Sequence, residues 1–490
     1  MNKKYLPYIL LVIIIAIAAF LRLYRIEDYM GFLGDEGRDA LVVKRMIVDH
    51  KFTLLGPITS VGLMHLGPIY YYFMVPFLWA WNLHPVGPAI MVALFSLATV
   101  FLVWQLCREF LNKRAGVIAA LLYAISPLVI VHSHSSWNPN ILPFWGLLLI
   151  YALLKVIIQK KHAYLWVMGA SLGVVIQLHY VALVFFPILL AAFVMQKVRL
   201  PITTWLKGAL GFFVVYSPYI LFELRHQFIN TKTVWEFVTR SGDGSTFAFH
   251  LIIGKFWDLL VRLFWRLIVI ENAELTIVFV LFAVVSLIWI FKTSQKAQKQ
   301  VLAVFGIWLI VGIGVLSFYT GNTYDYYLMF AFPLPFILTG AVLAHFSKTK
   351  LGALGVLVVL LMLSRIHIAQ TSILKPPNRI VAQTKEISDF VLQQVGQDPY
   401  NFALIAAGNS DHAYRYFLEI GGKVPVTIEN EVVDPDRNTV TGQLMVVCEE
   451  KVCQPLGNSL WEIAGFGRAE IVNQWPVSVH QVFKLVPYLE

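Results

Sequence analysis

The composition of this 490-residue chain excludes a soluble globular protein. Hydrophobic residues make up 58% of the sequence and charged residues 13%, and the mean hydropathy is +0.71, whereas soluble domains carry about 25% charged residues. The net charge of +10 comes from Lys and Arg in short clusters between apolar runs, which is typical of cytoplasmic membrane anchors and argues against a nucleic-acid partner. Three cysteines are too few for a disulfide scaffold or a zinc module.

Apolar runs of spanning length recur along the chain and predict a polytopic α-helical membrane protein with about eleven transmembrane helices. The first run, 5–24, follows Lys3 and Lys4 and lacks a small-residue cleavage site, so we expect a retained helix with a cytoplasmic N-terminus. This assignment places the basic clusters of successive loops inside and the C-terminus outside, in a multi-pass protein of the plasma membrane. The other predicted spans are 86–106, 115–132, 138–158, 163–178, 181–195, 205–222, 274–291, 301–319, 327–346 and 351–368.

The first outer loop is predicted to cover 25–85. Within it, the apolar segment 68–81 is rich in Tyr and Trp but short for a crossing, and a crossing there would move Arg108, Lys113 and Arg114 to the outside. We therefore expect a re-entrant or interfacial helix and further juxtamembrane helices in this loop. Loops held by a rigid bundle commonly carry function.

The chain changes to ordinary soluble composition from Lys375 onwards. An amphipathic pattern at 380–395 predicts a helix, and the runs 402–406 and 444–447 are strand-like. We therefore predict a transmembrane domain, 1–370, and a small extracytoplasmic α/β domain, 371–490, which would cover the outer cavity.

Two cysteines of this C-terminal segment are close enough in sequence to be paired. Cys448 and Cys453 are separated by four residues, a spacing that a hairpin can bridge outside the cytoplasm. The alternative is two free thiols.

The motif GDEGRDA, residues 34–40, is the strongest chemical signal in the sequence. Asp35 and Glu36 are adjacent carboxylates, the residue type that proton abstraction or metal binding needs, and they follow the first helix. The alternative is structural, because acids in the first turn stabilise a helix start. Arg38 follows them and is a candidate for substrate binding.

Three sequence elements together resemble the GT-C glycosyltransferases of the protein O-mannosyltransferase and lipid A aminoarabinose transferase type, glycosyltransferase families 39 and 83. A first helix ends in FLRLYRI, a D-E pair follows, and HLGPIYYY comes next at 65–72. In the family the D-E pair precedes a proline-aromatic element similar to K-P-P-L-Y-Y. Here Pro68, Tyr70, Tyr71 and Tyr72 match it, whereas Leu66 and Gly67 replace the lysine and the first proline.

The resemblance implies roles for residues of this element and of the second outer loop. Tyr70 and Tyr71 would contact substrate, and His65 stands where a relative carries a metal-binding glutamate. His65 is thus a candidate ligand for a possible divalent metal, although a lone histidine is more often a polar loop residue. The loop in ISPLVIVHSHSSWNPN, 125–140, offers Asn138 and Asn140 where some relatives have an aspartate; an amide can bind substrate but cannot act as a base.

The last family-like element is YDYYLMFAFPLPFILTGA, 324–341, in which Tyr327 and two prolines match. The basic residue usual before the tyrosine is missing. Cations for a lipid phosphate must therefore come from elsewhere, and Arg262 and Arg266, four apart on one helix face, are candidates together with Lys255. Snorkelling of these side chains to lipid head groups is the alternative.

The resemblance implies an inverting hexosyl- or pentosyltransferase of the cell envelope that uses a polyprenyl-phosphate sugar on the outer face. Its acceptor would be a lipid, a protein or a polysaccharide. Asp35 would act as the base, with Glu36 in support. The competing hypotheses are a transporter or flippase for a lipid-linked sugar and an inactive scaffold. Transporters usually place ionisable residues near the bilayer midplane, whereas the acids here follow the first helix.

Overall fold

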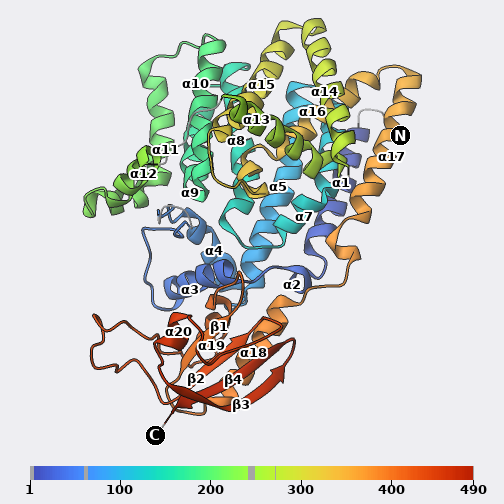
Figure 1. Cartoon of the computed structure of the whole chain (residues 1–490). Helices are drawn as coiled ribbons and strands as arrows, with labels where there is room; N and C mark the ends of the chain where they lie inside the picture. The colour runs from blue at the N-terminus through green and yellow to red at the C-terminus, as the bar shows by residue number, and fades with distance from the viewer. Residues whose placement is uncertain (1–4, 60–63, 241–248, 271, 489–490) are drawn as a thin grey trace. The chain divides into compact units, whose positions relative to one another are not determined.

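The structure is a computed structural model that describes residues 5–59, 64–240, 249–270 and 272–488 (Figure 1). The chain divides into two compact units, which we describe separately. The helical unit comprises Met1–Tyr24, Phe52–Met74 and Ala89–Pro376, and the mixed unit comprises Arg25–Lys51, Val75–Pro88 and Pro377–Glu490. The mixed unit thus combines the C-terminal segment, which the sequence predicts as a domain of its own, with parts of the predicted first outer loop.

The described residues contain seven helices long and apolar enough to cross a membrane, and two bent helix pairs raise this number to nine. Tyr164–Leu178 and Tyr180–Met195 are shorter apolar helices and coincide with two more predicted spans, so the predicted fold class of a polytopic helical protein is confirmed. The seven long spans are α1 (Leu6–Leu23), α5 (Val86–Phe110), η1 with α8 (Asn138–Ile157), α11 (Ile202–Arg225), α14 (Ala273–Thr293), α15 (Lys296–Ser317) and α17 (Lys350–Ala369).

The remaining helices of the helical unit are shorter or broken. The bent pairs are α6 (Lys113–Ile125) with α7 (Pro127–Ser133), at 61°, and η4 (Asp325–Ala331) with α16 (Pro333–Phe346), at 55°. A proline follows each break, and the residue before a proline is disfavoured in the helical conformation. The others are α9 (Tyr164–Leu178), η2 (Tyr180–Val184), α10 (Phe185–Met195), α12 (Ile229–Arg240), α13 (Phe249–Phe264), the π-helical turn η3 (Trp265–Val269) and η5 (Ser372–Leu374).

Side-chain caps mark where several spans begin. The Asn112 side chain accepts from the Ala115 N–H at 2.9 Å, and the Asn272 side chain accepts from the Leu275 N–H at 2.8 Å. These bonds satisfy amides that a helix start otherwise leaves without partners. The spans then continue through apolar sequence, and α11, α14 and α17 leave most of their apolar surface exposed.

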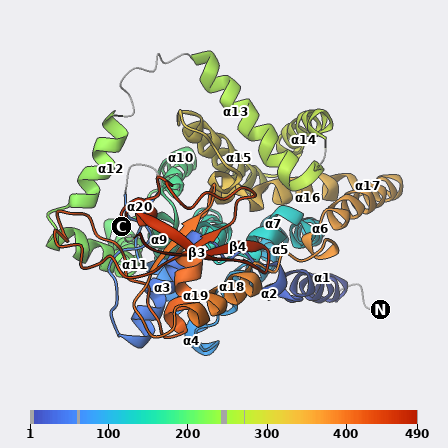
Figure 2. The ribbon, with the colours of Figure 1, turned by 60° about the horizontal axis from the view of Figure 1, so that its bottom comes forward.

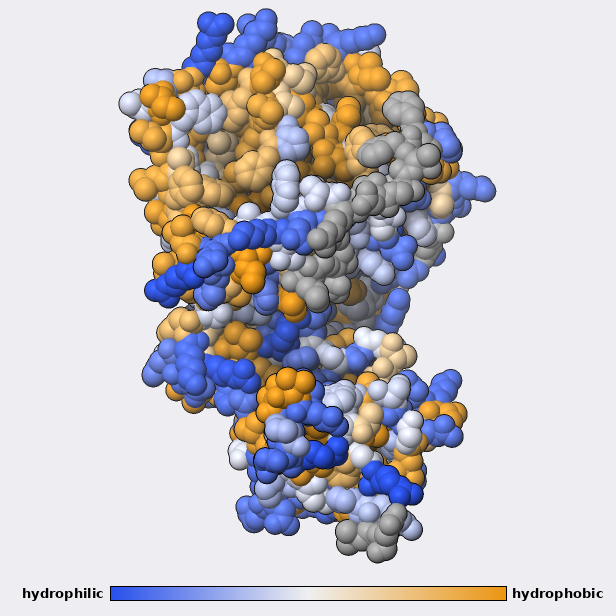
Figure 3. Space-filling view, turned by 60° about the vertical axis from the view of Figure 1, so that its left-hand side comes forward, coloured by the Kyte–Doolittle hydropathy of each residue, from blue (hydrophilic) through white to orange (hydrophobic). Residues whose placement is uncertain are grey.

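Apolar side chains cover much of the helical unit's surface on the face drawn in Figure 3. An exposed apolar surface of this extent is expected in a lipid solvent. The chain is therefore a multi-pass membrane protein, while the side on which each terminus lies stays a prediction.

The mixed unit is built around a four-stranded sheet with strand order β1-β2-β4-β3, of which β3 and β4 are labelled in Figure 2. β1 and β2 are parallel, and the other two pairs are antiparallel. The strands are β1 (Asn401–Ile405), β2 (Leu444–Cys448), β3 (Ala469–Val477) and β4 (His480–Pro487), and the helices are α2 (Ile26–Tyr29), α3 (Gly34–Val48), α18 (Ile380–Gln394), α19 (His412–Ile420) and α20 (Trp461–Ala464). The helix α4 (Ile69–Ala80) begins in the helical unit and ends in this one.

The central strands β1 and β2 are buried on both faces. Phe402, Leu404 and Val447 belong to one core, with Val391 of α18 and Leu418 of α19. The alternate positions of the same strands belong to a second core on the other face, as the period of two in a strand requires. The predicted helix and both predicted strands are confirmed. The hairpin of β3 and β4 was not predicted, because β3 is largely exposed and lacks a regular alternation of polar and apolar residues.

Cys448, the last residue of β2, forms a disulfide with Cys453, and their Cα atoms are 6.3 Å apart. The bond closes the short loop that contains Glu449. The third cysteine, Cys107, is free and buried in α5.

Candidate functional site

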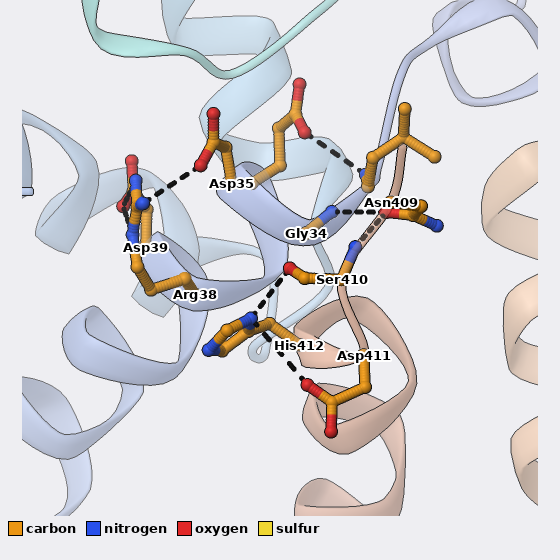
Figure 4. Close-up of polar contacts among 10 residues, drawn as sticks. Gly34, Asp35, Arg38, Asp39, Asn409, Ser410, Asp411 and His412 are labelled. Atoms are coloured by element: carbon orange, nitrogen blue, oxygen red, sulfur yellow. Dashed lines mark hydrogen bonds and ion pairs between the residues drawn. The ribbon is translucent and has the colours of Figure 1, made fainter. Parts of the chain in front are cut away.

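The acidic motif forms the first turn of α3, in the mixed unit (Figure 4). Leu33 has extended backbone angles and is the N-cap residue. The Glu36 carboxylate turns back and accepts the Leu33 N–H at 3.1 Å. This is the glutamate half of a capping box, so Glu36 has a clear structural role at the helix start.

Asp35 points away from that cap and contacts Arg38, one turn along the helix. The Arg38 Nη1 lies 2.9 Å from Asp35 Oδ1, and the Asp35 side chain is 52% exposed. Arg38 also donates through Nε and Nη2 to the buried carboxylate of Asp39, at 3.0 and 2.9 Å. Arg38 is thereby held by a buried acid and presents one nitrogen to Asp35, which fixes the Asp35 carboxylate at an accessible position.

The two glycines of the motif, Gly34 and Gly37, lie on a different face of α3, which is packed. A Cβ atom at Gly34 would lie 1.9 Å from Ser410 Oγ, and one at Gly37 would lie 2.3 Å from the Ala413 backbone nitrogen. Positions i and i+3 share one face of a helix, and here that face contacts the start of α19. The glycines therefore serve close packing, while Asp35 and Arg38 stay accessible.

Burial affects a histidine close to the acidic motif. His412 begins α19, and its Nδ1 lies 2.9 Å from Ser410 Oγ. Partial burial lowers the pKa of His412 below its ordinary value of 6.5, although the nearby Asp411 and Asp35 carboxylates oppose this effect. His412 is therefore mostly neutral at pH 7 and adds little positive charge beside Asp35.

Three of the predicted cations contact the segment between α15 and the start of η4, in the helical unit. They are Lys255, Arg262 and Arg266, and we call them, together with Asp325, the basic cluster. Arg262 and Arg266 each lie 2.8 Å from the Asp325 carboxylate, on its two different oxygens. Lys255 donates to the Tyr319 carbonyl and, at 3.0 Å, to the Gly321 carbonyl. With three cations and one acid the cluster carries a formal charge of +2, which the neighbouring Asp258 reduces.

A cavity of about 510 Å³ opens beside the two arginines. Asp258, Trp265 and Asp325 line it together with Arg262 and Arg266. A planar guanidinium can bind a phosphate through two parallel hydrogen bonds. The cavity and the excess of cations make this a candidate anion site, as the sequence predicts for these arginines.

Tyr327 lies in η4, within a group of aromatic rings. Its ring centroid is 4.7 Å from that of Tyr326 and 5.9 Å from that of Tyr319. His179 joins the group at 5.4 Å from Tyr327. Because η4 begins at Asp325, this helical segment contains the acid of the basic cluster and two of these rings, Tyr326 and Tyr327.

His65 belongs to a different network of the helical unit. Its N–H donates to Asn230 Oδ1 at 2.7 Å, and its carbonyl accepts from the Tyr180 hydroxyl at 2.5 Å and from Asn230 Nδ2 at 2.9 Å. The buried Glu223 carboxylate accepts the Thr231 N–H at 2.8 Å. This network ties the loop before α4 to the start of α12 mainly through the His65 backbone.

The remaining predicted substrate-binding residues are buried. Tyr70 shares a 2.9 Å hydrogen bond with Ser136, and Tyr71 is only 3% exposed. Asn138 donates to the Leu178 carbonyl, and Asn140 donates to the Ser135 carbonyl at 2.8 Å. Asn140 thus folds the predicted second outer loop on itself, and Asn138 connects this loop to the end of α9. Their role toward substrate stays a prediction.

Metal binding finds little support around His65. Its Nδ1 lies 3.5 Å from the Gly56 carbonyl, and in the described part of the chain no group of three or more His, Cys, Asp or Glu could hold a metal ion. Protein metal sites usually combine several such ligands. The metal role of His65 therefore stays a sequence prediction.

Sequence reasoning missed three residues that organise these sites. Asp325 binds both arginines, Asn230 holds the His65 loop, and Asn409 contacts the start of α3. Asn230 and Asn409 lie 165 and 375 positions from their partners, so local spacing carries no signal for them. The polar run GNSDH after the strand-like segment was the one available hint for Asn409.

Comparison with known proteins gives one family and one fold. Residues 68–222 match the family described as dolichyl-phosphate-mannose-protein mannosyltransferase. No curated protein sequence matches the chain. The matched range includes Tyr70, Tyr71, Asn138 and Asn140.

Solved structures resemble the whole chain at low sequence identity. ArnT from Cupriavidus metallidurans bound to undecaprenyl phosphate has a TM-score of 0.66 and 12% identity over 99% of this chain and 98% of its own. The oligosaccharyltransferase AglB from Archaeoglobus fulgidus, in complex with an inhibitory peptide and a dolichol-phosphate, has a TM-score of 0.56 and 14% identity over 91% and 69%. The arabinofuranosyltransferase AftD from Mycobacteria has a TM-score of 0.54 and 11% identity over 100% and 40%. The chain therefore has the GT-C fold that its sequence resembles.

Proposed function

We propose that this protein is a membrane glycosyltransferase that moves a sugar from a polyprenyl-phosphate donor to a hydroxyl group of a lipid, protein or polysaccharide acceptor. The observation that carries the proposal is the start of α3, where Asp35 is accessible and paired with Arg38 while Glu36 is used as a cap. The GT-C fold and the ligands of ArnT and AglB support the choice of a lipid-phosphate donor.

Asp35 has the role of general base in this proposal. As the acceptor oxygen attacks the anomeric carbon of the sugar, its proton passes to Asp35, and the bond between that carbon and the phosphate oxygen breaks. The single displacement inverts the anomeric centre. A carboxylate can accept the proton through either oxygen, and Arg38 holds only Oδ1 by the ion pair.

The leaving group in this reaction is a lipid phosphate, which departs with the electron pair of the broken bond. A phosphate needs no proton to leave if positive charge stabilises it. Arg262 and Arg266 are the proposed partners, because they converge on one carboxylate beside a cavity. A bound phosphate would compete with Asp325 for the two guanidinium groups.

The aromatic group around Tyr327 is the proposed contact for the sugar or for the first part of its lipid. Small-molecule sites combine apolar and aromatic walls with a few polar groups. Tyr326 and Tyr327 of this group follow Asp325 directly in η4, so one helical segment would contribute to both phosphate and sugar binding.

The test is transfer of radiolabelled sugar from synthetic polyprenyl-phosphate mannose, glucose or aminoarabinose to total membrane acceptors. Asp35→Asn should lower transfer about 10²- to 10⁴-fold, the usual contribution of a general base. Asp28→Asn is the matched control, because Asp28 makes the same type of ion pair with Arg25, three residues before it, at 2.7 Å. The control should retain transfer within about threefold, since exposed ion pairs contribute little.

Two outcomes would count against the proposal. Equal transfer by wild type and Asp35→Asn would remove Asp35 from the reaction. Failure of wild type to transfer label from each donor, together with movement of the labelled lipid across a vesicle bilayer, would establish a flippase instead.

A further inference from the structure

Asn409 connects the sheet of the mixed unit to the first amide of the acidic helix. It lies in the loop between β1 and α19, and its Oδ1 accepts the Gly34 N–H at 2.9 Å (Figure 4). The same oxygen accepts the Ser410 N–H at 2.9 Å. Gly34 is the first residue of α3, so Asn409 satisfies an amide that the helix itself cannot pair.

The other end of the Asn409 amide is held by an acid. Its Nδ2 donates to both oxygens of Glu449, at 3.0 and 3.2 Å. The amide must have this orientation, because the opposite one would set a carbonyl oxygen against a carboxylate and an NH₂ group against two N–H donors. Glu449 therefore determines which atom of Asn409 faces α3.

Glu449 is itself fixed by its surroundings. Its N–H donates to the Ile405 carbonyl at 3.0 Å, and its Oε1 accepts the Tyr414 hydroxyl at 2.9 Å. Burial raises the pKa of Tyr414, and the adjacent Glu449 charge raises it further, so the phenol remains a donor at every physiological pH. The disulfide between Cys448 and Cys453 closes the loop around this residue.

Further contacts hold the rest of α3 against α19. The contact of Gly37 with the Ala413 backbone leaves no room for a side chain. Towards the other end of α3, Lys44 lies 2.8 Å from Glu419. Asp35 directly follows Gly34, and a small rotation of the first turn would move its short side chain. The Asn409 bond is the one that restrains this turn at its first amide.

We propose that Asn409 is a positioning residue for Asp35, oriented by Glu449, so that the C-terminal segment sets the geometry of the proposed base. This inference rests on the proposed role of Asp35. The C-terminal segment, which the sequence analysis expects to cover the outer cavity, would thus also position a residue of the reaction.

The test places the carboxylate at position 409 and the amide at position 449. Asn409→Asp keeps an oxygen for the Gly34 N–H but places a carboxylate against Glu449, with repulsion in place of a hydrogen bond. The double variant N409D/E449Q restores a donor at position 449, an acceptor at position 409 and the original net charge. Asn458→Asp is the matched control, because Asn458 also accepts a backbone N–H, from Leu460 at 3.0 Å, in the same unit.

Two experiments are carried out on the full-length protein in nanodiscs. One measures the kcat and the donor KM of sugar transfer, and the other measures hydrogen exchange of the peptide that covers residues 33–40. For Asn409→Asp we expect kcat to fall about ten- to a hundredfold, the effect of a displacement near 1 Å, with donor KM changed less than threefold. Exchange in 33–40 should accelerate. N409D/E449Q should recover both quantities, and Asn458→Asp should leave both unchanged.

The outcomes separate this inference from the proposed function. If wild type transfers sugar and Asn409→Asp keeps its kcat, or if the double variant is no better than Asn409→Asp, the positioning role is wrong. If wild type transfers no sugar, the proposed function fails, and the exchange data alone then decide whether Asn409 and Glu449 hold the start of α3.

Discussion

The start of α3 and the basic cluster both pair arginine with aspartate, yet the two regions are built in opposite ways. At α3 one arginine lies between two aspartates, and the helix is packed so closely that Gly34 and Gly37 cannot carry a side chain. In the basic cluster one aspartate lies between two arginines, beside a cavity of about 510 Å³. The first region has excess acid on a fixed backbone, and the second has excess cation next to open space.

The difference corresponds to what each proposed role demands. A general base must be held in place, because catalysis by proton transfer depends on hydrogen-bond geometry. A site for a phosphate must instead be able to exchange an internal partner for the ligand, and an Arg–Asp pair at a cavity can do so. Four sets of variants test whether the two regions differ in this way.

Among these variants, the largest effect on transfer is expected for Gly37→Ala. The added Cβ would lie 2.3 Å from the Ala413 nitrogen and 2.5 Å from its Cα, which are backbone atoms, so α3 must shift. Overpacking of this kind costs about 1–3 kcal/mol, and we expect transfer to fall at least about tenfold. Gly408→Ala is the control, because a Cβ there meets no atom within 4 Å. Equal transfer by the two variants would show that α3 is not closely held.

Arg262→Gln and Arg266→Gln address the second region. Each removes a charge-assisted hydrogen bond to the donor phosphate, worth about 1.5–3 kcal/mol. This bond also stabilises the phosphate as it leaves, so kcat/KM for the donor should fall about tenfold or more. Initial rates over a range of donor concentrations measure this. Arg365→Gln removes a guanidinium from the same unit and should leave kcat/KM unchanged. An unchanged kcat/KM in both variants would remove these arginines from the proposed site.

The disulfide should have a moderate effect, on stability more than on transfer. Cys448 and Cys453 close a loop with a sequence separation of 5, for which chain entropy predicts about 2 kcal/mol of stabilisation. The double variant C448S/C453S should show faster hydrogen exchange at 444–453. Reductant should reproduce this in wild type and have no effect in the variant. Unchanged exchange in both would indicate that Glu449 is fixed without the disulfide.

The smallest effect is expected for Glu36→Gln. Its amide oxygen can still accept the Leu33 N–H, so transfer should stay within about twofold of wild type. Glu36→Ala loses the cap, at a cost of roughly 0.5–2 kcal/mol, and should raise hydrogen exchange at 33–40. Loss of transfer in Glu36→Gln as large as in Asp35→Asn would make Glu36 the base and would overturn the assignment of the two acids.

The sequence by itself determined the helical membrane fold. A helix in lipid requires a long run of apolar residues, and such a run is visible in a short stretch of sequence. It also determined the elements at 380–395, 402–406 and 444–447, whose buried faces follow simple periods. Of the candidate site, it identified the acid pair and the two arginines, since adjacent carboxylates and arginines four apart on a helix are local patterns.

Only the tertiary structure decided which role each residue of the acidic motif has. Asp35 and Glu36 are equivalent in the sequence, but the fold uses Glu36 as a cap and leaves Asp35 accessible. The glycines beside them pack on a segment more than 370 positions away, the same segment from which Asn409 contacts Gly34. Contacts between distant segments depend on how the chain closes in space, and a single sequence carries no period or spacing that reports them.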